Sequence, residues 1–595
     1  MRSAREAWRG VQKPVFVPAS LVILAMIVFA VVYSGTASDA FSRLNTAITD
    51  GVGWWYILVA TGFVVFALYC VFSRVGNIRL GGDDETPEFG LPSWFAMLFS
   101  AGMGIGLVFY GVAEPLNHYV NPPEAGGVPG STDAAADQAM QLTLFHWGLH
   151  AWAIYVVVGL GLAYMTYRKR RPLSIRWLLE PLLGRKRIEG PIGHAIDVVA
   201  VVGTVFGIAT SLGFGVQQIS AGFEYLGWVE PNNWFVIGLI AVVTGLATFS
   251  VITGVTRGLR WLSNINMGLA AGLALFVLLL GPTIFLLEAW VQNIGGYAQA
   301  LPQLMLRTSP FAEDGWAGAW TIFYWAWWMS WAPFVGMFIA RISRGRTIRE
   351  FVLGVLLAPT LIGSLWFTIF GDSGLLRQRN DGDMLGAGGS VDTNTTLFQL
   401  LDGLPVATLT SLLAIAVVVF FFVTSCDSGS LVIDNLSSGG TLETPKVSRT
   451  YWAVLLGVVA AVLLLVGGSG SLTALQTASI ATALPFSIIM VLACVSMLKA
   501  FRYEMATAPR YLRVSTRAAS DGTGDVSEPS HHLLDEGVSA TLAGLPPATR
   551  GEVADRDGHF VVAVNELPAH AVDVDPDTGT MKYSRKSHAR DPLRE

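Results

Sequence analysis

Tryptophan is concentrated in one short part of this chain. The stretch "YWAWWMSWAPF", residues 324–334, holds four of the nineteen tryptophans, Trp325, Trp327, Trp328 and Trp331. The faces of indole rings attract cations that cannot lose a proton, such as quaternary ammonium groups, and each contact contributes about 0.5–2 kcal/mol. The surrounding segment "WTIFYWAWWMSWAPFVGMF" contains no Asp or Glu. A zwitterion that carries its own carboxylate therefore fits this segment better than a bare cation does.

A second aromatic set lies in "FHWGLHAWAIY", and it contributes Trp147, Trp152 and Tyr155. Anchoring at the lipid headgroups would place tryptophan at the ends of a membrane helix, but the tryptophans of 324–334 lie mid-run. Packing between helices would account for one or two of them. In each set two aromatic residues share a helix face at i, i+3, Trp152 with Tyr155 and Trp328 with Trp331. We interpret the two sets as halves of one ammonium-binding cage.

Alternating glycines mark a third segment, "SAGMGIGLVFYGVAEP", with Gly102, Gly104 and Gly106 inside an apolar run. A dinucleotide fingerprint is excluded because residue 107 is not glycine and no strand precedes the motif. Close helix packing is an alternative, although alternate glycines fall on different faces of a helix. Such glycines allow the backbone to unwind and present its polar groups to a ligand. We predict that this segment, including Met103, contributes to a binding site.

Catalytic and metal-binding patterns are not indicated. His146 and His150 have the i, i+4 spacing of metal ligands, but no third ligand is evident, and we expect a structural or hydrogen-bonding role for them. The three cysteines, Cys70, Cys426 and Cys494, lie in apolar stretches, which favours neither a disulfide framework nor a zinc site. The chain has no H-E-x-x-H or G-x-S-x-G motif. We expect neither an enzyme nor an organic cofactor.

The composition indicates the elements that must position these residues. The chain of 595 residues is 52% hydrophobic and 14% charged, with a mean hydropathy of +0.53, whereas soluble domains are about 25% charged. A net charge of −5 argues against a nucleic-acid partner. Runs of about 20 apolar residues can cross a membrane. Twelve such runs are predicted, at 16–34, 52–73, 92–114, 146–167, 195–221, 234–254, 265–286, 317–340, 351–371, 404–425, 450–467 and 478–498.

Basic residues support this count. With the N-terminus inside, the cytoplasmic connections hold 18 Lys and Arg and the opposite connections hold 4, as the positive-inside rule requires. Both termini are therefore predicted to be cytoplasmic. Residues 503–595 are polar, with 10 Lys or Arg against 15 Asp or Glu, so a basic lipid-binding tail is not assumed. The stretch "HFVVAVNELPAHAVDVDPDTGTMKY" alternates like one or two short strands, and the alternative is a largely disordered tail.

The motifs "GMGIGLVFYGVAEP", "FHWGLHAWAIY" and "FYWAWWMSWAPFVGMFIARISRGRTIREF" together resemble the betaine/carnitine/choline transporter family, most of all its sodium-coupled glycine betaine members. The resemblance covers about residues 16–500. It implies an all-α homotrimer in the bacterial cell membrane, with twelve transmembrane helices and two inverted five-helix repeats of the LeuT type. The implied regions are a cytoplasmic N-terminus (1–15), helices one and two (16–91), the first repeat (92–286), a lateral amphipathic helix near 287–305 with its loop (287–316), the second repeat (317–498) and a cytoplasmic tail (499–595).

The resemblance also implies roles for single residues. Trp331 matches the indole that contacts the ammonium group most directly, and Gly106 replaces the Asp of choline-type members, which points to a zwitterion such as betaine. The other residues that match the aromatic box or lie beside the substrate path are Trp147, Trp152, Tyr155, Trp328, Trp325, Trp327, Phe338 and Ser211.

For the coupling ion, the resemblance implies a sodium site with the hydroxyls of Thr424 and Ser425 in "FFVTSCDS". Carbonyl groups of Ser100, Met103 and Phe421 would complete it. The alternative for the two hydroxyls is a hydrogen bond to carbonyls of their own helix.

The family's second sodium site uses two threonines one turn apart in the fifth span. This chain has Thr204 but Ile208 at those positions. A site with Thr204 and Phe334 is therefore expected to be weakened or absent, because isoleucine offers no oxygen.

The sequence thus predicts secondary active uptake of glycine betaine or a related compatible solute such as ectoine or proline. Sodium would drive the uptake, and alternating access would expose a cage at the membrane midplane to each side in turn. The alternatives are a choline or carnitine carrier with proton coupling or exchange, and a quaternary-ammonium sensor that does not transport. Membrane lipid is the remaining expected partner.

Overall fold

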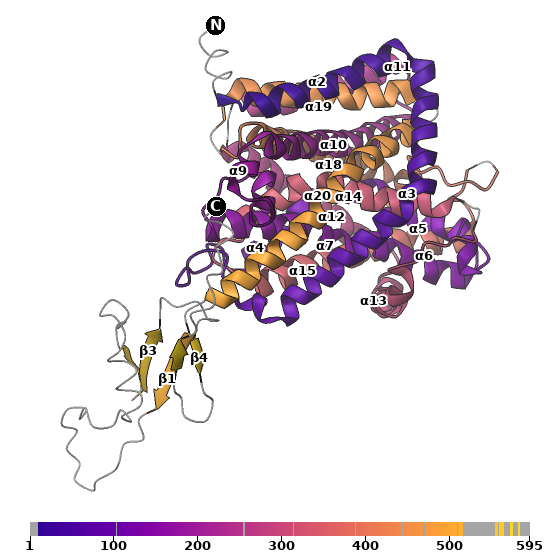
Figure 1. Ribbon diagram of the computed structural model, residues 1–595. Coiled ribbons are helices and arrows are strands. Elements are labelled where there is room, and N and C mark those ends of the chain that lie inside the picture. The colour runs from indigo at the N-terminus through magenta and orange to yellow at the C-terminus, as the bar shows by residue number, and fades with distance from the viewer. Residues whose placement is uncertain are drawn as a thin grey trace. The chain divides into compact units, whose positions relative to one another are not determined.

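Helices predominate in this protein (Figure 1). The computed structural model describes residues 10–102, 104–253, 256–312, 315–386, 388–441, 444–467, 471–507, 510–515, 554–556, 559–564, 572–574 and 581–583. The chain divides into two compact units, Met1–Val495 and Ser496–Glu595.

The long helices of the first half are α2 (Lys13–Val32), α3 (Ser34–Phe72), α4 (Leu91–Gly102), α5 (Ile105–Val120), α6 (Asp133–Trp147), α7 (Leu149–Ala163), α10 (Pro191–Tyr225), α11 (Asn233–Thr253), α12 (Thr256–Leu280) and α13 (Thr283–Leu304). The second half has α14 (Phe323–Arg341), α15 (Ile348–Phe367), α16 (Ser373–Asp381), α17 (Thr396–Asp402), α18 (Ala407–Ser437), α19 (Lys446–Gly467) and α20 (Ser471–Thr507). Shorter segments are η1 (Arg74–Asn77), η2 (Glu124–Gly126), η3 (Tyr164–Arg168), η4 (Ile175–Leu179), α8 (Glu180–Leu183), α9 (Arg185–Ile188), η5 (Gly318–Ile322) and η6 (Thr368–Asp372).

Ten helical segments of the described residues are long and apolar enough to cross a membrane, which makes the chain a multi-pass membrane protein. They coincide with ten of the twelve predicted runs. The two remaining runs are also helical: 92–114 falls on the interrupted pair α4 and α5, and 317–340 falls on η5 and α14, where tryptophan is abundant.

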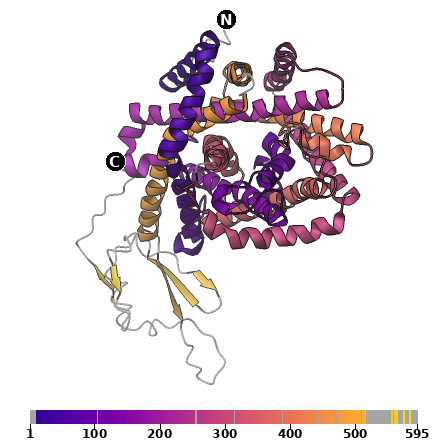
Figure 2. The same ribbon diagram turned by 90° about the vertical axis from the view of Figure 1, so that its right-hand side faces the viewer.

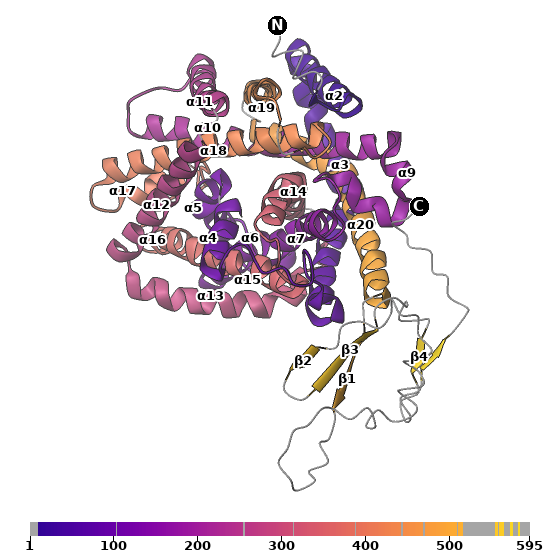
Figure 3. The ribbon, with the colours of Figure 1, turned by 90° about the vertical axis from the view of Figure 1, so that its left-hand side faces the viewer.

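Helices α7 and α14 pack extensively against each other and are buried over nearly all of their length. Helix α10 packs against α14 and α18, and α2, α11 and α19 lie side by side on the outer side of α10 (Figures 2 and 3). Helix α13 occupies the place of the predicted lateral helix, where it packs along α6. The two aromatic sets therefore lie on helices at the centre of the bundle.

Local sequence explains where some helices begin. Pro191 stands in the first turn of α10, where a missing backbone N–H removes no helical hydrogen bond. Helix α15 begins with a capping box, in which the Thr347 hydroxyl accepts from the Glu350 N–H and the Glu350 carboxylate accepts from the Thr347 N–H.

Two helix breaks lie next to the aromatic residues. The predicted break in the glycine-rich segment is confirmed, because α4 ends at Gly102 and Gly104 is extended, with φ −148° and ψ −171°. The predicted run 146–167 lies within the apolar helical segment Asp133–Arg168, but this segment is interrupted near the start of the run. Gly148 separates α6 from α7, and a Cβ there would lie 2.5 Å from Leu144 O and 2.8 Å from Tyr297 Oη. A bulkier residue would not fit at this break.

The second unit contains short strands. Strands β1 (Arg510–Ser515), β3 (His559–Val564) and β2 (Ala554–Arg556) form an antiparallel sheet in that order, and β4 (Val572–Val574) pairs with β5 (Met581–Tyr583). The stretch predicted to hold one or two strands holds three, β3, β4 and β5.

Candidate functional site

The two aromatic sets form one cluster at the contact of α7, α14 and the end of α6. The ring of Trp328 lies 4.9 Å from Trp147 in an edge-to-face arrangement and stacks on Trp327 at 4.6 Å. Tyr155 lies 6.2 Å from Trp328 and 5.5 Å from Trp152, measured between ring centroids. Together with Trp331, which lies 6.5 Å from Trp327, these residues are called the aromatic cage below.

Hydrogen bonds at the ring edges fix the orientation of the cage. The indole N–H of Trp328 donates to His146 O at 2.9 Å, and that of Trp331 donates to Gly207 O at 2.8 Å. The Trp327 N–H donates to Ser211 Oγ at 3.2 Å, which gives Ser211 a supporting contact beside the cage. The protein engages the ring edges, so a cation would meet the rings at their faces, although Trp327 and Trp328 cover one face of each other.

Glycines of α5 and of the break before it provide the room for these rings. A Cβ at Gly106 would lie 2.5 Å from Trp327 Cη2 and 3.0 Å from Trp147 Cη2, and one at Gly104 would lie 3.3 Å from Trp331 Cη2. The backbone of the broken helix therefore contacts the cage directly.

One other predicted residue, Trp325, lies away from this contact surface. Trp325 is fully buried and stacks on His150, with 5.1 Å between ring centroids. Gly102 is the last residue of α4, and Met103 lies outside the described residues. A substrate or sodium role for Met103 stays a prediction.

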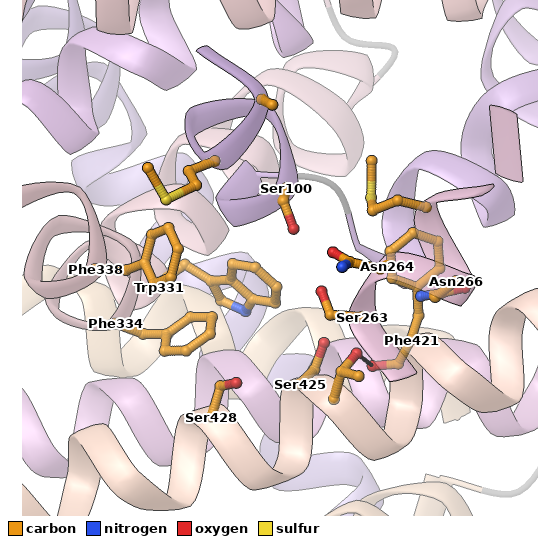
Figure 4. Close-up of a pocket in the computed structure, with 14 residues that line it drawn as sticks. Ser100, Ser263, Asn264, Asn266, Trp331, Phe334, Phe338, Phe421, Ser425 and Ser428 are labelled. Carbon is orange, nitrogen blue, oxygen red and sulfur yellow. Dashed lines mark hydrogen bonds between the residues drawn. The ribbon is translucent and has the colours of Figure 1, made fainter. Parts of the chain in front are cut away.

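A cavity of about 470 Å³ adjoins the cage between α4, α12, α14 and α18 (Figure 4). It brings Trp331 and Phe338 together with four predicted sodium ligands, Ser100, Phe421, Thr424 and Ser425. The remaining lining residues are Ala96, Met97, Ser263, Asn264, Asn266, Met267, Phe334 and Ser428. None of the 14 lining residues is acidic or basic. Neutral oxygen atoms and aromatic faces are what this cavity offers to a ligand.

The polar atoms of the cavity come from three helices. In Figure 4 the hydroxyls of Ser100, Ser263 and Ser425 point into the space between α4, α12 and α18. Thr424 Oγ1 donates to Phe420 O at 2.8 Å and Phe421 O at 3.2 Å, which is the back-bonding considered as the alternative. That bond uses the proton of the hydroxyl and leaves oxygen lone pairs for a cation. Back-bonding and ion ligation by Thr424 are therefore compatible.

The contribution of α12 to this cavity was not predicted. Ser263 and Asn264 precede the predicted run 265–286, and Asn266 lies at its start. The available signal was the polar tetrapeptide "SNIN" inside an otherwise apolar helix.

The second sodium motif has a different environment. The Thr204 hydroxyl is buried and donates to Ala200 O at 2.7 Å. The side chain of Ile208 fills the space beside Gly429 of α18, where an added Cβ would lie 2.6 Å from Ile208 Cδ1. Hydrocarbon therefore lies where the motif would supply its second hydroxyl. Phe334, the other residue expected at this second site, lines the cavity described above.

A buried carboxylate behind the cage was also not predicted. Glu114 Oε1 lies 2.7 Å from His146 Nδ1 and 3.3 Å from His118 Nε2. Glu114 Oε2 accepts the indole N–H of Trp147 at 2.7 Å and the hydroxyl of Tyr324. All three ionisable side chains are 0% exposed. The available signal was a carboxylate and a histidine at i, i+4 in an apolar helix, a combination that is costly in membranes and therefore usually functional.

This arrangement bears on the two histidines of the fourth span, for which the sequence showed no third potential metal ligand. His146 does have further partners, because potential ligand atoms of Glu114, His118 and His146 lie within 4.8 Å of one another. His150 does not join them and stacks on Trp325 instead. The hydrogen-bonding role expected for His146 is confirmed.

A broken helix against a buried aromatic cage in a multi-pass bundle is the architecture of a membrane transporter. The family model described as "BCCT, betaine/carnitine/choline family transporter" matches residues 14–506, and the chain belongs to this family. The resemblance inferred from the three motifs is thereby confirmed, and the protein is a transporter rather than an enzyme.

Three relatives illustrate the range of similarity. The chain is 66% identical to an uncharacterized transporter of Mycobacterium tuberculosis, covering 97% of this chain and 93% of the relative. It is 45% identical to the glycine betaine transporter OpuD of Bacillus subtilis, covering 81% and 94%. It is 40% identical to a glycine betaine/proline/choline transporter of Vibrio parahaemolyticus, covering 85% and 91%.

Proposed function

We propose that this protein takes up glycine betaine or a related compatible solute, such as ectoine or proline, by sodium-coupled alternating access. The observation that carries the proposal is the cavity that is lined both by Trp331 of the cage and by Thr424 and Ser425. A quaternary ammonium group and a sodium ion bound there would be neighbours. Each would therefore influence the affinity of the other.

The chemistry of the cage supports a quaternary ammonium headgroup. Aromatic faces bind a cation without removing a proton from it, and no charged side chain lines the adjoining cavity. The space at Gly106 has no room for a larger side chain between Trp327 and Trp147, so no counter-charge can be placed there. A solute that carries its own carboxylate is consistent with this arrangement.

The ligands proposed for sodium are neutral oxygens from two helices. Ser100 lines the cavity from α4, and Phe421, Thr424 and Ser425 line it from α18. Sodium bound between them would hold the broken helix against α18 and stabilise one conformation of the pair. Because Ile208 offers no oxygen, we propose that this single site carries the coupling.

The architecture proposed for this mechanism has twelve transmembrane helices. Helices α4 with α5 and η5 with α14 would add two spans to the ten long apolar ones, and they would begin the two inverted repeats, 92–286 and 317–498. We propose that both termini are cytoplasmic, that the protein resides in the bacterial plasma membrane and that it assembles as a homotrimer.

A second candidate, a choline or carnitine carrier coupled to protons, is favoured by one observation. Glu114 is buried beside two histidines, and such clusters carry protons in membrane transporters. The relative named for glycine betaine, proline and choline makes choline a necessary competitor in any substrate test.

Uptake into proteoliposomes separates these possibilities. Labelled betaine is offered with a sodium, lithium or proton gradient, and choline, carnitine, ectoine and proline serve as competitors. We expect accumulation that requires sodium and is abolished by Trp331→Ala. Uptake driven by protons alone would overturn sodium coupling, and binding without accumulation would identify a sensor.

A further inference from the structure

Four hydrogen-bonding side chains surround the carboxylate of Glu114, and we assign its protons from their pattern. Thr321 Oγ1 lies 2.9 Å from His146 Nε2, so the hydroxyl can donate to this nitrogen and leave the proton of the neutral imidazole on Nδ1, facing Glu114. His118 presents Nε2 to Glu114, and its Nδ1 has no hydrogen-bond partner among the described residues. This tautomer assignment follows from the hydrogen-bond pattern.

With this assignment the carboxylate accepts four hydrogen bonds, from two neutral imidazoles, the indole of Trp147 and the hydroxyl of Tyr324. With both imidazoles neutral, the cluster carries one negative charge. Within the described part of the chain, the basic side chains next to Glu114 are His118 and His146, which are neutral in this assignment, and no lysine or arginine is paired with it. A buried charge is normally paired with an opposite charge or a metal, so a cationic partner is still to be supplied.

The negative charge is connected to the cage through a ring. Trp147 shares its indole N–H with Glu114 at 2.7 Å, while its ring contacts Trp328 at 4.9 Å. Tyr324, the other neutral donor on the same oxygen, lies 5.5 Å from Trp147 and 5.7 Å from Trp328, measured between ring centroids. A hydrogen bond to a charged acceptor polarises its donor. Electron density in the Trp147 ring therefore increases, and with it the attraction of the ring face for a cation.

We infer that Glu114 is a specificity-determining residue that acts behind the cage. It orients Trp147, polarises the ring and supplies a fixed negative field, and together these favour a cationic headgroup over a neutral group of the same shape. This inference rests on the proposed binding of a quaternary ammonium solute. Glu114 itself is covered by the rings and need not touch the solute.

A pair of isosteric ligands tests this role. Glycine betaine and 3,3-dimethylbutanoate have the same shape and the same carboxylate, but only betaine carries a positive charge. Affinities of both are measured on the purified full-length protein by calorimetry, for the wild type and for Glu114→Gln. We expect Glu114→Gln to weaken betaine about tenfold and to leave 3,3-dimethylbutanoate within about twofold, since the variant removes charge and keeps the size of the side chain.

Two matched variants control this measurement. Asp372→Asn neutralises another buried carboxylate, which accepts from Asn293 Nδ2 at 2.6 Å, and we expect it to leave the ratio of the two affinities unchanged. Glu114→Asp retains the charge and is expected to preserve the preference for betaine. If Glu114→Gln does not fold, the wild-type affinities decide the question, because equal affinity for betaine and 3,3-dimethylbutanoate would overturn the inference.

The remaining outcomes are also decisive. Equal weakening of both ligands by Glu114→Gln, with a lowered melting temperature, would assign Glu114 a structural role and overturn the inference. An unchanged ratio would overturn it as well. A wild-type protein that binds neither ligand would instead overturn the proposed function on which the inference rests.

Discussion

The broken pair α4–α5 and the helix α14 meet at the cage and contribute opposite features to it. In the first, α4 ends at Gly102 and α5 begins at Ile105, and the pair brings small residues, whereas α14 runs unbroken from Phe323 to Arg341 and brings bulky ones. Gly106 lies against Trp327, and Gly104 lies against Trp331. The glycine-rich segment and the tryptophan-rich segment of the sequence thus pack against each other.

This comparison explains why the interruption and the tryptophans occur together. Indole rings in the middle of a bundle need space, and a regular turn with ordinary side chains at 104 and 106 would fill that space. Interiors are close-packed, so an increase in volume on one side requires a decrease on the other. Substitutions that alter either side therefore test the same arrangement.

Removal of an indole from the α14 side should have the largest effect. Trp331→Ala deletes the ring that joins the cage to the cavity, which removes about 0.5–2 kcal/mol of cation–π attraction and leaves a cavity that costs about 3–5 kcal/mol of stability. We expect betaine uptake to fall to background in proteoliposomes. Trp54→Ala is the control, because Trp54 of α3 is 53% exposed. Normal uptake by Trp331→Ala would refute the assignment of the cage.

Added volume on the α5 side should have the next largest effect. Gly106→Ala places a Cβ about 2.5 Å from Trp327 Cη2, and overpacking of this kind costs about 1–3 kcal/mol. We expect betaine affinity to fall about tenfold, measured by calorimetry. The control is Gly363→Ala in α15, where a Cβ would meet no atom within 4 Å. An equal loss in both variants would show that the effect is not due to the cage.

Removal of the Thr424 hydroxyl should have a smaller effect, confined to the sodium dependence of uptake. Thr424→Val keeps the shape but removes the oxygen, and loss of one hydrogen-bonding or ligating group costs about 1–2 kcal/mol. We expect the sodium concentration for half-maximal uptake to rise about tenfold, with little change in uptake at saturating sodium. Thr410→Val is the matched control, because Thr410 lies on the same helix and donates to Ala407 O. A similar shift in the control would argue against ion ligation.

Substitution of Ile208 should have the smallest effect on sodium-dependent uptake. The wild type should show a sodium Hill coefficient of about one, because hydrocarbon occupies the second motif. Ile208→Val should leave that coefficient unchanged and reduce stability by only about 0.5–1.5 kcal/mol, measured by thermal unfolding. A coefficient near two would show that Thr204 belongs to a second working site.

Much of this molecule was predictable, because long apolar runs leave few alternatives to membrane helices. The interruption near Gly104 was predictable from alternating glycines. The break at Gly148 was not, because a single glycine in an apolar run does not reveal that Tyr297 of α13 approaches it. Contacts between distant helices decide such positions.

The same reason explains why Glu114 was not predicted. Its donors come from α5, α6 and α14, and Tyr324 lies 210 residues further along the chain. In the sequence alone, a glutamate next to Pro115 indicates the polar end of a membrane-spanning helix. Only the folded arrangement of the three helices makes it the partner of Trp147.

The hydrogen bonds of Trp328 and Trp331 also have a consequence for how this transporter can evolve. Both indoles donate to main-chain oxygens, those of His146 and Gly207. A point mutation at either position changes a side chain but still leaves a carbonyl group in the chain. The acceptor of each ring therefore persists in any variant, but position 207 must stay glycine, because a Cβ there would lie 3.0 Å from Trp331 Cδ1. Trp327 and Trp147 depend on the side chains of Ser211 and Glu114, so a single substitution at either residue can remove the acceptor that orients its ring.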